Sequence, residues 1–312
     1  MTRRRGGTNS RRAPRGGLPL SEFKTGTVDA NGLRFRFLEA GSGPLVLCLH
    51  GFPDHARSFR HQLEVLARAG FRAVAPFMRG YSPTEQPRDG QYQTAALAQD
   101  AVALIDALGD GSAAAVFGHD WGAVAAYGAA ILAPKKIERL VTAAVPHGPA
   151  FLQALMTDYD QQRRSWYMFF FQHPFADIAV SSGDFAFLER LWADWSPGWN
   201  CGRAEMDRLK ETFRQPGVLQ AALGYYRCTL NPALQAPELS ELQQRIAMSP
   251  VEVPTLTFHG EQDGCVGVGL VTGMEPFFPK GLRLEIVSGA GHFVHQERPE
   301  QVNRSLLQFL RR

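Results

Sequence analysis

Residues 114–123, AAVFGHDWGA, decide the fold that we predict for this chain. An apolar run typical of a buried strand passes directly into the segment GHDWG, and a small-residue run with helical character follows. A passage of this kind through Gly-x-Asp-x-Gly makes a strained turn, in which Gly118 and Gly122 permit a tight approach. We therefore expect Asp120 to project above the edge of a sheet, at the N-terminus of a helix.

Asp120 is the candidate nucleophile. The dipole of the following helix favours the ionised carboxylate, and the free N–H groups at that helix end are able to bind an oxyanion. A carboxylate nucleophile forms an ester with an electrophilic carbon, and an activated water must then hydrolyse this ester. Serine esterases carry serine at the centre of Gly-x-Ser-x-Gly, and the absence of that motif from the chain excludes them.

A base and a supporting acid are found in two later loops. In FHGEQDGCV, Asp263 comes just after a predicted strand, and in GAGHFVHQERPE, His292 precedes the last predicted helix. Asp263 is therefore the candidate acid, and His292 is the candidate base that activates water. The alternatives are a loop-capping role for Asp263 and a surface position for His292. His119, next to the nucleophile, is expected to be a packed structural histidine.

The rest of the chain alternates between strand and helix patterns. Two polar-alternating segments flank Asn31-Gly32 and predict an antiparallel pair of strands. Strands are expected over 23–30, 32–40, 45–50, 71–76, 113–119, 137–145, 254–260 and 282–289, and helices over 58–69, 94–108, 121–132 and 299–312. This alternation predicts a mainly parallel sheet with helices on both faces.

Residues 146–240 depart from this alternation. They contain all but one of the tryptophans and many other aromatic residues, at helical spacing and without clear strand patterns. We predict that they form a helical cap over the edge of the sheet at which α/β folds bind ligands. The core then comprises residues 21–145 and 241–312. Ordinary packing in a hydrophobic core is the alternative interpretation of these aromatic residues.

The net charge of +3 is unevenly distributed. Residues 1–17 carry six arginines and no acid, which leaves a net charge of −3 on the remaining residues. We predict that residues 1–20 are a disordered, arginine-rich tail, because so few apolar residues cannot pack. A nucleic-acid-binding arm is the alternative, but no nucleic-acid partner is predicted. No apolar run reaches the roughly 20 residues of a membrane helix, so no membrane partner is predicted either.

The cysteines carry no recognisable pattern. They are widely spaced and form neither a zinc motif nor a disulfide framework. The four residues are Cys48, Cys201, Cys228 and Cys265. We infer a reducing, cytoplasmic setting, and we expect neither a metal nor another cofactor.

Four motifs resemble those of the epoxide hydrolases in the α/β-hydrolase superfamily. They are HGFPD (50–54), RGYSPT (79–84), GHDWGA (118–123) and GHFVHQERPE (291–300). The resemblance implies the α/β-hydrolase fold, with its chain order of nucleophile, acid and histidine. It also implies an oxyanion hole formed by the N–H groups of Phe52 and Trp121, and a cis Phe52–Pro53 bond.

The resemblance further implies two cap tyrosines, whose hydroxyls bind the epoxide oxygen and stabilise the alkoxide. WYMFFFQHP resembles the first tyrosine segment and points to Tyr167, and GYYRCTL points to Tyr226, with Tyr225 as the alternative register. Both could instead be packed aromatic residues with incidental hydroxyls. The implied reaction opens a small apolar epoxide with water to a 1,2-diol, through an ester on Asp120. A homodimer is one candidate assembly.

Three other functions use the same fold. Haloalkane dehalogenases share Asp120, His292 and Trp121, but they need N–H donors around a halide, and many carry asparagine where this chain has Phe52. Fluoroacetate dehalogenases usually show a His-Trp pair in the cap, where this chain has Tyr-Met. A non-catalytic receptor would need none of the catalytic set. Candidates for a halide donor in the cap are Trp166, Trp192, Trp195 and Trp199.

Overall fold

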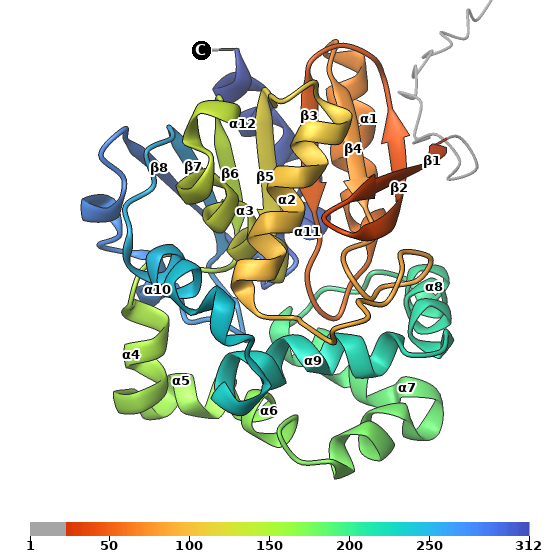
Figure 1. Cartoon of the computed structure of the whole chain (residues 1–312). Coiled ribbons are helices and arrows are strands. Elements are labelled where there is room, and N and C mark those ends of the chain that lie inside the picture. The colour runs from red at the N-terminus through yellow and green to blue at the C-terminus, as the bar shows by residue number, and fades with distance from the viewer. Residues whose placement is uncertain (1–22, 312) are drawn as a thin grey trace, which may run out of the picture.

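A computed structural model describes residues 23–311, and the predicted tail over residues 1–20 lies outside them. The core is an eight-stranded sheet with helices on both faces, and a group of helices lies beyond one end of its strands (Figure 1). This architecture confirms the predicted fold class, a mostly parallel sheet with an inserted helical cap.

The sheet has the strand order β1-β2-β4-β3-β5-β6-β7-β8. β1 pairs with β2 and β2 with β4 in antiparallel fashion, and all the other pairs are parallel. The strands are β1 (Lys24–Ala30), β2 (Leu33–Ala40), β3 (Leu45–Leu49), β4 (Arg72–Pro76), β5 (Ala115–His119), β6 (Leu140–Ala143), β7 (Thr255–Gly260) and β8 (Leu282–Val287). Each of them lies within a segment in which the sequence predicts a strand.

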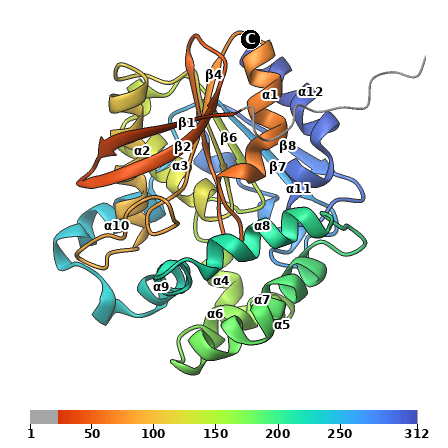
Figure 2. The same cartoon turned by 90° about the vertical axis from the view of Figure 1, so that its right-hand side faces the viewer.

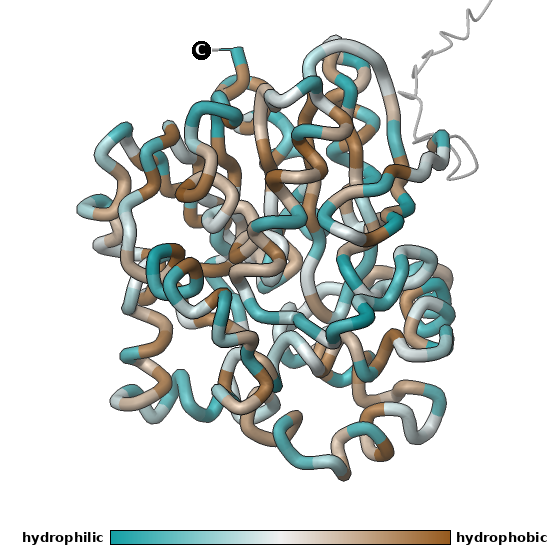
Figure 3. The backbone as a smooth tube through the Cα atoms, viewed as in Figure 1, coloured by the Kyte–Doolittle hydropathy of each residue, from teal (hydrophilic) through white to brown (hydrophobic). Residues whose placement is uncertain are grey.

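Two layers of helices bury the central strands. Side chains of β3 alternate between the layers: Leu47 packs toward α2 and α3, and Cys48 packs toward α1 and α12. Figure 2 shows these layers from the side, and in Figure 3 hydrophobic segments follow the strands in the middle of the sheet. The core helices are α1 (Arg60–Arg68), α2 (Thr94–Leu108), α3 (Trp121–Leu132), α10 (Ser240–Met248), α11 (Val294–Glu297) and α12 (Pro299–Leu310).

The cap lies between β6 and α10 and contains helices without a strand. One of its helices, α7, is interrupted: Gly183, Asp184 and Phe185 have φ values of 58°, 57° and 58°. The left-handed turn presents Asp184 to Arg214 of α8, whose guanidinium donates two hydrogen bonds to it. The cap helices are α4 (Ala150–Thr157), α5 (Tyr159–Arg164), α6 (Trp166–Phe170), α7 (Phe175–Trp195), α8 (Arg203–Arg214) and α9 (Val218–Leu230).

A buried ion pair of the core lies beside a contact between the core and the cap. The guanidinium of Arg79 donates to both carboxylate oxygens of Asp100 in α2, at 2.5 and 2.6 Å, and to the carbonyl of Gln91 at 2.6 Å. The carbonyl of Arg79 accepts a hydrogen bond from the hydroxyl of Tyr225 in α9, at 2.8 Å. Arg79 therefore connects the RGYSPT loop both to α2 in the core and to α9 in the cap.

We expect Asp100→Ala to lower the free energy of unfolding by about 3–5 kcal/mol, because it leaves the Arg79 charge buried without a partner. The two side chains are only 7% and 4% exposed, so water cannot replace the lost carboxylate. Urea unfolding measures the change. Asp106→Ala, which removes a partly exposed partner of Lys136, is the control and should cost less than about 1 kcal/mol. Equal losses in the two variants would contradict this account.

Candidate active site

The turn from β5 into α3 has the strained geometry that the sequence predicts. Asp120 adopts φ 53° and ψ −121°, between the last residue of the strand and the first residue of the helix. A Cβ atom at Gly122 would lie 1.9 Å from the carbonyl oxygen of Leu49, and one at Gly118 would lie 2.1 Å from that of Gly122. Only glycine fits these two positions, and their close approach holds Asp120 at the sheet edge.

Asp120 is 7% exposed, and its carboxylate is held by the loop that follows β3. Its Oδ1 accepts a hydrogen bond of 2.7 Å from the backbone N–H of Phe52. The Phe52–Pro53 peptide bond is cis, as the resemblance implies. Within residues 23–311, the bond from Phe52 is the hydrogen bond that the carboxylate receives from the two predicted oxyanion donors, Phe52 and Trp121. One of the two predicted oxyanion donors is thus engaged in this state of the protein.

His292 lies between the two predicted carboxylates. Its Nδ1 forms a hydrogen bond of 3.0 Å with Oδ2 of Asp263, and its Nε2 lies 3.6 Å from Oδ2 of Asp120. Oδ1 of Asp263 accepts two backbone N–H groups, from Cys265 at 2.7 Å and Val266 at 2.9 Å. These bonds fix the carboxylate, which in turn orients the imidazole toward Asp120.

The buried charges of this group stabilise one another. Burial opposes ionisation of Asp263, but His292, His259 and the backbone N–H of Val266 hold the pKa of this carboxyl below its ordinary value. Burial likewise disfavours a charged imidazole, yet Asp263 raises the pKa of His292 well above the ordinary value, and Asp120 acts in the same direction. Loss of the Asp120 charge would therefore lower the pKa of His292.

An apolar cavity of ≈ 160 Å³ lies against Asp120. Its wall is formed by the core and by cap helices α4, α6 and α9, and both predicted tyrosines belong to it. The lining residues are Thr94, Asp120, Trp121, Val124, Val145, Phe151, Tyr167, Met168, Tyr226, Thr229, Cys265 and Val266.

The two cap tyrosines lie next to each other on this wall, with ring centroids 5.6 Å apart. The hydroxyl of Tyr226 is buried and has no hydrogen-bond partner in the part of the chain that the structure describes, whereas that of Tyr167 lies 3.2 Å from Sγ of Cys265. Burial raises the pKa of both phenols well above the ordinary value, so both remain neutral donors. Tyr225, the alternative register, instead donates to the carbonyl of Arg79.

Within residues 23–311, none of the four cap tryptophans lines the cavity. Trp192 donates its indole N–H to the carbonyl of Pro53 at 2.9 Å, and Trp166 is exposed on the surface of the cap. Trp121 does reach the cavity, and its buried indole N–H has no hydrogen-bond partner among the described residues.

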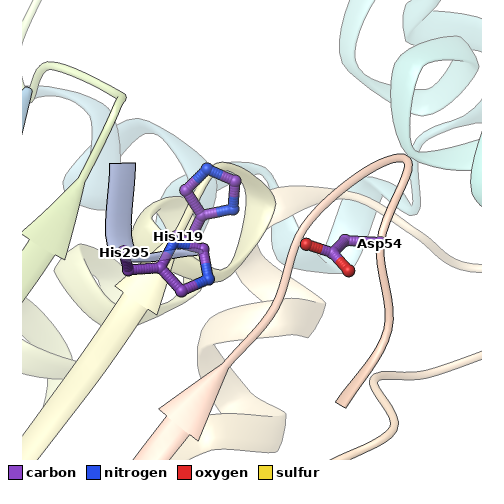
Figure 4. Close-up of side chains that lie close together, drawn as sticks. All are labelled: Asp54, His119 and His295. Carbon is purple, nitrogen blue, oxygen red and sulfur yellow. The ribbon is translucent and has the colours of Figure 1, made fainter. Parts of the chain in front are cut away.

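A second buried polar cluster, which the sequence analysis missed, lies beside the first. Figure 4 shows His119 and His295, whose rings are 4.5 Å apart, facing Asp54. His119 Nε2 lies 3.0 Å from the carbonyl oxygen of His292, which agrees with a structural role for His119. Burial raises the pKa of Asp54 to about 8 and lowers that of His119 to about 3, so the cluster is largely uncharged near neutral pH.

Comparison with known proteins places the chain in a family. Residues 44–299 match the family model described as alpha/beta hydrolase fold. The chain belongs to this family. Among curated relatives of this α/β hydrolase, human epoxide hydrolase 4 is 32% identical over 94% of this chain and 81% of its own length. Epoxide hydrolase A of Mycobacterium tuberculosis is 30% identical over 91% of this chain and 96% of its own length.

Solved structures of epoxide hydrolases resemble this α/β hydrolase as well. A Bacillus megaterium epoxide hydrolase in complex with an inhibitor superimposes with a TM-score of 0.80 at 26% identity, over 92% of this chain and all of that one. An epoxide hydrolase from Vigna radiata gives a TM-score of 0.79 at 27% identity, over 94% and 99% of the two chains. The prediction of a hydrolase from the epoxide hydrolase branch of the superfamily is confirmed. Within residues 23–311, no helix is both long and apolar enough to cross a membrane.

Proposed function

We propose that this hydrolase opens an apolar epoxide to a 1,2-diol, through a covalent ester on Asp120. The observation that carries the proposal is the position of two neutral tyrosine hydroxyls on the wall of the apolar cavity that contains Asp120. The names of the similar proteins, among them human epoxide hydrolase 4, support the same reaction.

In the first step, Oδ2 of Asp120 attacks one epoxide carbon and the carbon–oxygen bond of the ring breaks. The developing alkoxide needs donors, and the hydroxyls of Tyr167 and Tyr226 supply them. Their raised pKa values keep the protons on the phenols until the alkoxide forms, and one phenol then transfers its proton to the alkoxide. Oδ1 of Asp120 meanwhile stays in its hydrogen bond with the N–H of Phe52.

In the second step, His292 removes a proton from water, and the resulting hydroxide attacks Cγ of the Asp120 ester. Ester formation has removed the charge of Asp120, so the pKa of His292 falls when the base is needed. Asp263 stabilises the imidazolium that forms. The N–H of Phe52, joined by that of Trp121, holds the oxyanion. Its collapse expels the ester oxygen as an alkoxide, which takes the proton of the carboxyl group, so the diol is released and the carboxylate of Asp120 is restored. The imidazolium of His292 returns its proton, by way of water, to the tyrosinate left by ring opening.

The second candidate is haloalkane dehalogenation, which the unpartnered indole N–H of Trp121 favours. A halide site needs further N–H donors, and no cap tryptophan of the described residues reaches the cavity. Turnover of styrene oxide beside 1-bromobutane separates the candidates. Diol release supports the epoxide hydrolase, halide release supports the dehalogenase, and tight binding without turnover supports a receptor.

We further propose that residues 146–240 act as the cap over residues 21–145 and 241–312, and that the enzyme works in the cytoplasm. The second proposal rests on the four cysteines, all of which are free thiols. A reducing compartment preserves such thiols.

We expect Asp263→Asn to slow hydrolysis of the ester by about 10²-fold or more, while ester formation changes little. The amide would keep Oδ1 for the backbone donors but would present N–H groups to Nδ1 of His292. That exchange places the imidazole proton on Nε2, which then cannot accept a proton from water. Single-turnover measurements of ester formation and diol release test this. An unchanged rate of diol release would mean that a group other than Asp263 orients His292 and stabilises the imidazolium.

A further inference from the structure

Cys265 is a free thiol inside the catalytic group, two residues after Asp263. Its side chain is buried and belongs to the wall of the cavity that contains Asp120, so a small solute in that cavity can reach it. Its backbone N–H binds Asp263, and its Sγ lies 3.2 Å from the hydroxyl of Tyr167. The proposed reaction gives this thiol no task.

The donor atoms around Cys265 match the preferences of a soft divalent cation. Sγ of Cys265, a ring nitrogen of His292 and a carboxylate oxygen of Asp263 all lie within 4.8 Å of one another. Zn²⁺ binds sulfur at about 2.3 Å and nitrogen or oxygen at about 2.0–2.2 Å, so modest side-chain rotations would bring the three donors onto one ion. Thiolate also selects Zn²⁺ over Mg²⁺ and Ca²⁺, which prefer oxygen.

The ring nitrogen of His292 that faces Asp120 is also open to a ligand. Nε2 of His292 is buried and has no hydrogen-bond partner among residues 23–311, although the ring faces Asp120. The second cluster, Asp54 with His119 and His295, also satisfies the distance criterion. It has no sulfur donor, however, and none of its members lines the cavity.

We propose that Cys265, His292 and Asp263 form an inhibitory binding site for Zn²⁺. When the ion binds, the S–H bond of Cys265 breaks, its proton passes to water, and a sulfur–zinc bond forms. The imidazolium of His292 also gives up a ring proton to water, and the freed lone pair binds the same ion. Binding through Nε2 removes the base, and binding through Nδ1 breaks the bond to Asp263, so either mode stops the water-activating step. The inhibition rests on the proposed function, whereas the binding itself does not.

Binding is measured first, on the purified full chain, with Co²⁺ as a spectroscopic probe for Zn²⁺. We expect a sulfur-to-cobalt charge-transfer band that Zn²⁺ displaces and that Mg²⁺ leaves unchanged. The band should be lost in Cys265→Ser, which keeps a hydroxyl beside Tyr167, and in Cys265→Ala. Cys201→Ser, which removes the most accessible thiol, and His295→Gln, which disrupts the second cluster, should both retain it. Loss of the band in either control, or its persistence without Cys265, would overturn the site.

Inhibition is measured next, as the Zn²⁺ concentration that halves diol release in each variant. We expect this concentration to rise at least about tenfold when Cys265 is replaced by serine or alanine, relative to Cys201→Ser. Equal sensitivity in all the variants would overturn the inhibitory role. If no epoxide is turned over but the Cys265-dependent band appears, the proposed function fails and the metal site stands. Circular dichroism of each variant confirms that a lost band does not reflect unfolding.

Discussion

His292→Gln is expected to form the Asp120 ester and then to stall. Asp120 is an anion that needs no base for its attack, whereas hydrolysis of the ester needs a base for water. Diol release should fall by about 10²–10⁴-fold. After incubation with an epoxide that the wild type accepts, the intact protein should gain the mass of one substrate molecule. Peptide mapping should place this mass on the segment that contains Asp120.

Two comparisons make this result specific. His173→Gln changes an exposed histidine of the cap and should turn over the epoxide without a lasting adduct. Asp120→Ala in the His292→Gln background should gain no mass, since the nucleophile is gone. An adduct on another residue, or none with an accepted epoxide, would rule out the mechanism. A serine-type enzyme would behave differently, because its nucleophile needs the histidine before it can attack.

Much of the core could be predicted from the sequence because its signals are local. The apolar run of β5, the two glycines around Asp120 and the small residues of α3 each act within a few positions, and they give the strand, turn and helix observed. The loops that carry Asp263 and His292 follow from the same alternation. Parallel strands bring such loops to one sheet edge, and the two side chains are hydrogen-bonded there.

What the sequence could not predict depends on long-range packing. Whether Tyr225 or Tyr226 faces the cavity depends on the rotation of α9 about its axis. In the structure Tyr226 lines the cavity, and the hydroxyl of Tyr225 donates to the carbonyl of Arg79. The left-handed residues inside α7 are stabilised by α8, which no local pattern of α7 encodes. The sequence analysis did not identify Cys265, the proposed zinc ligand, because the spacing of the cysteines matches no metal motif. Its position two residues after the candidate acid was the available signal.

Replacing Tyr167 and Tyr226 together with phenylalanine should nearly abolish ring opening in a protein that remains folded. The ring of Tyr226 packs edge-on against Phe52 and Trp121, and phenylalanine preserves these contacts. Only the donors to the alkoxide are lost, and each is worth about 10²–10³-fold in rate. Single variants should therefore keep partial activity, because one hydroxyl remains. Burst measurements of ester formation detect the affected step.

Tyr225→Phe is the matched control, in the same helix and next to Tyr226. It removes a hydroxyl that binds the carbonyl of Arg79, so it should cost about 1 kcal/mol of stability and little epoxide turnover. The contrast between neighbouring tyrosines separates a chemical role from a packing role, because both are buried and both pack against other aromatic rings. Full ring opening in the double variant, or a larger loss in Tyr225→Phe, would move the electrophilic donors to other groups on the cavity wall.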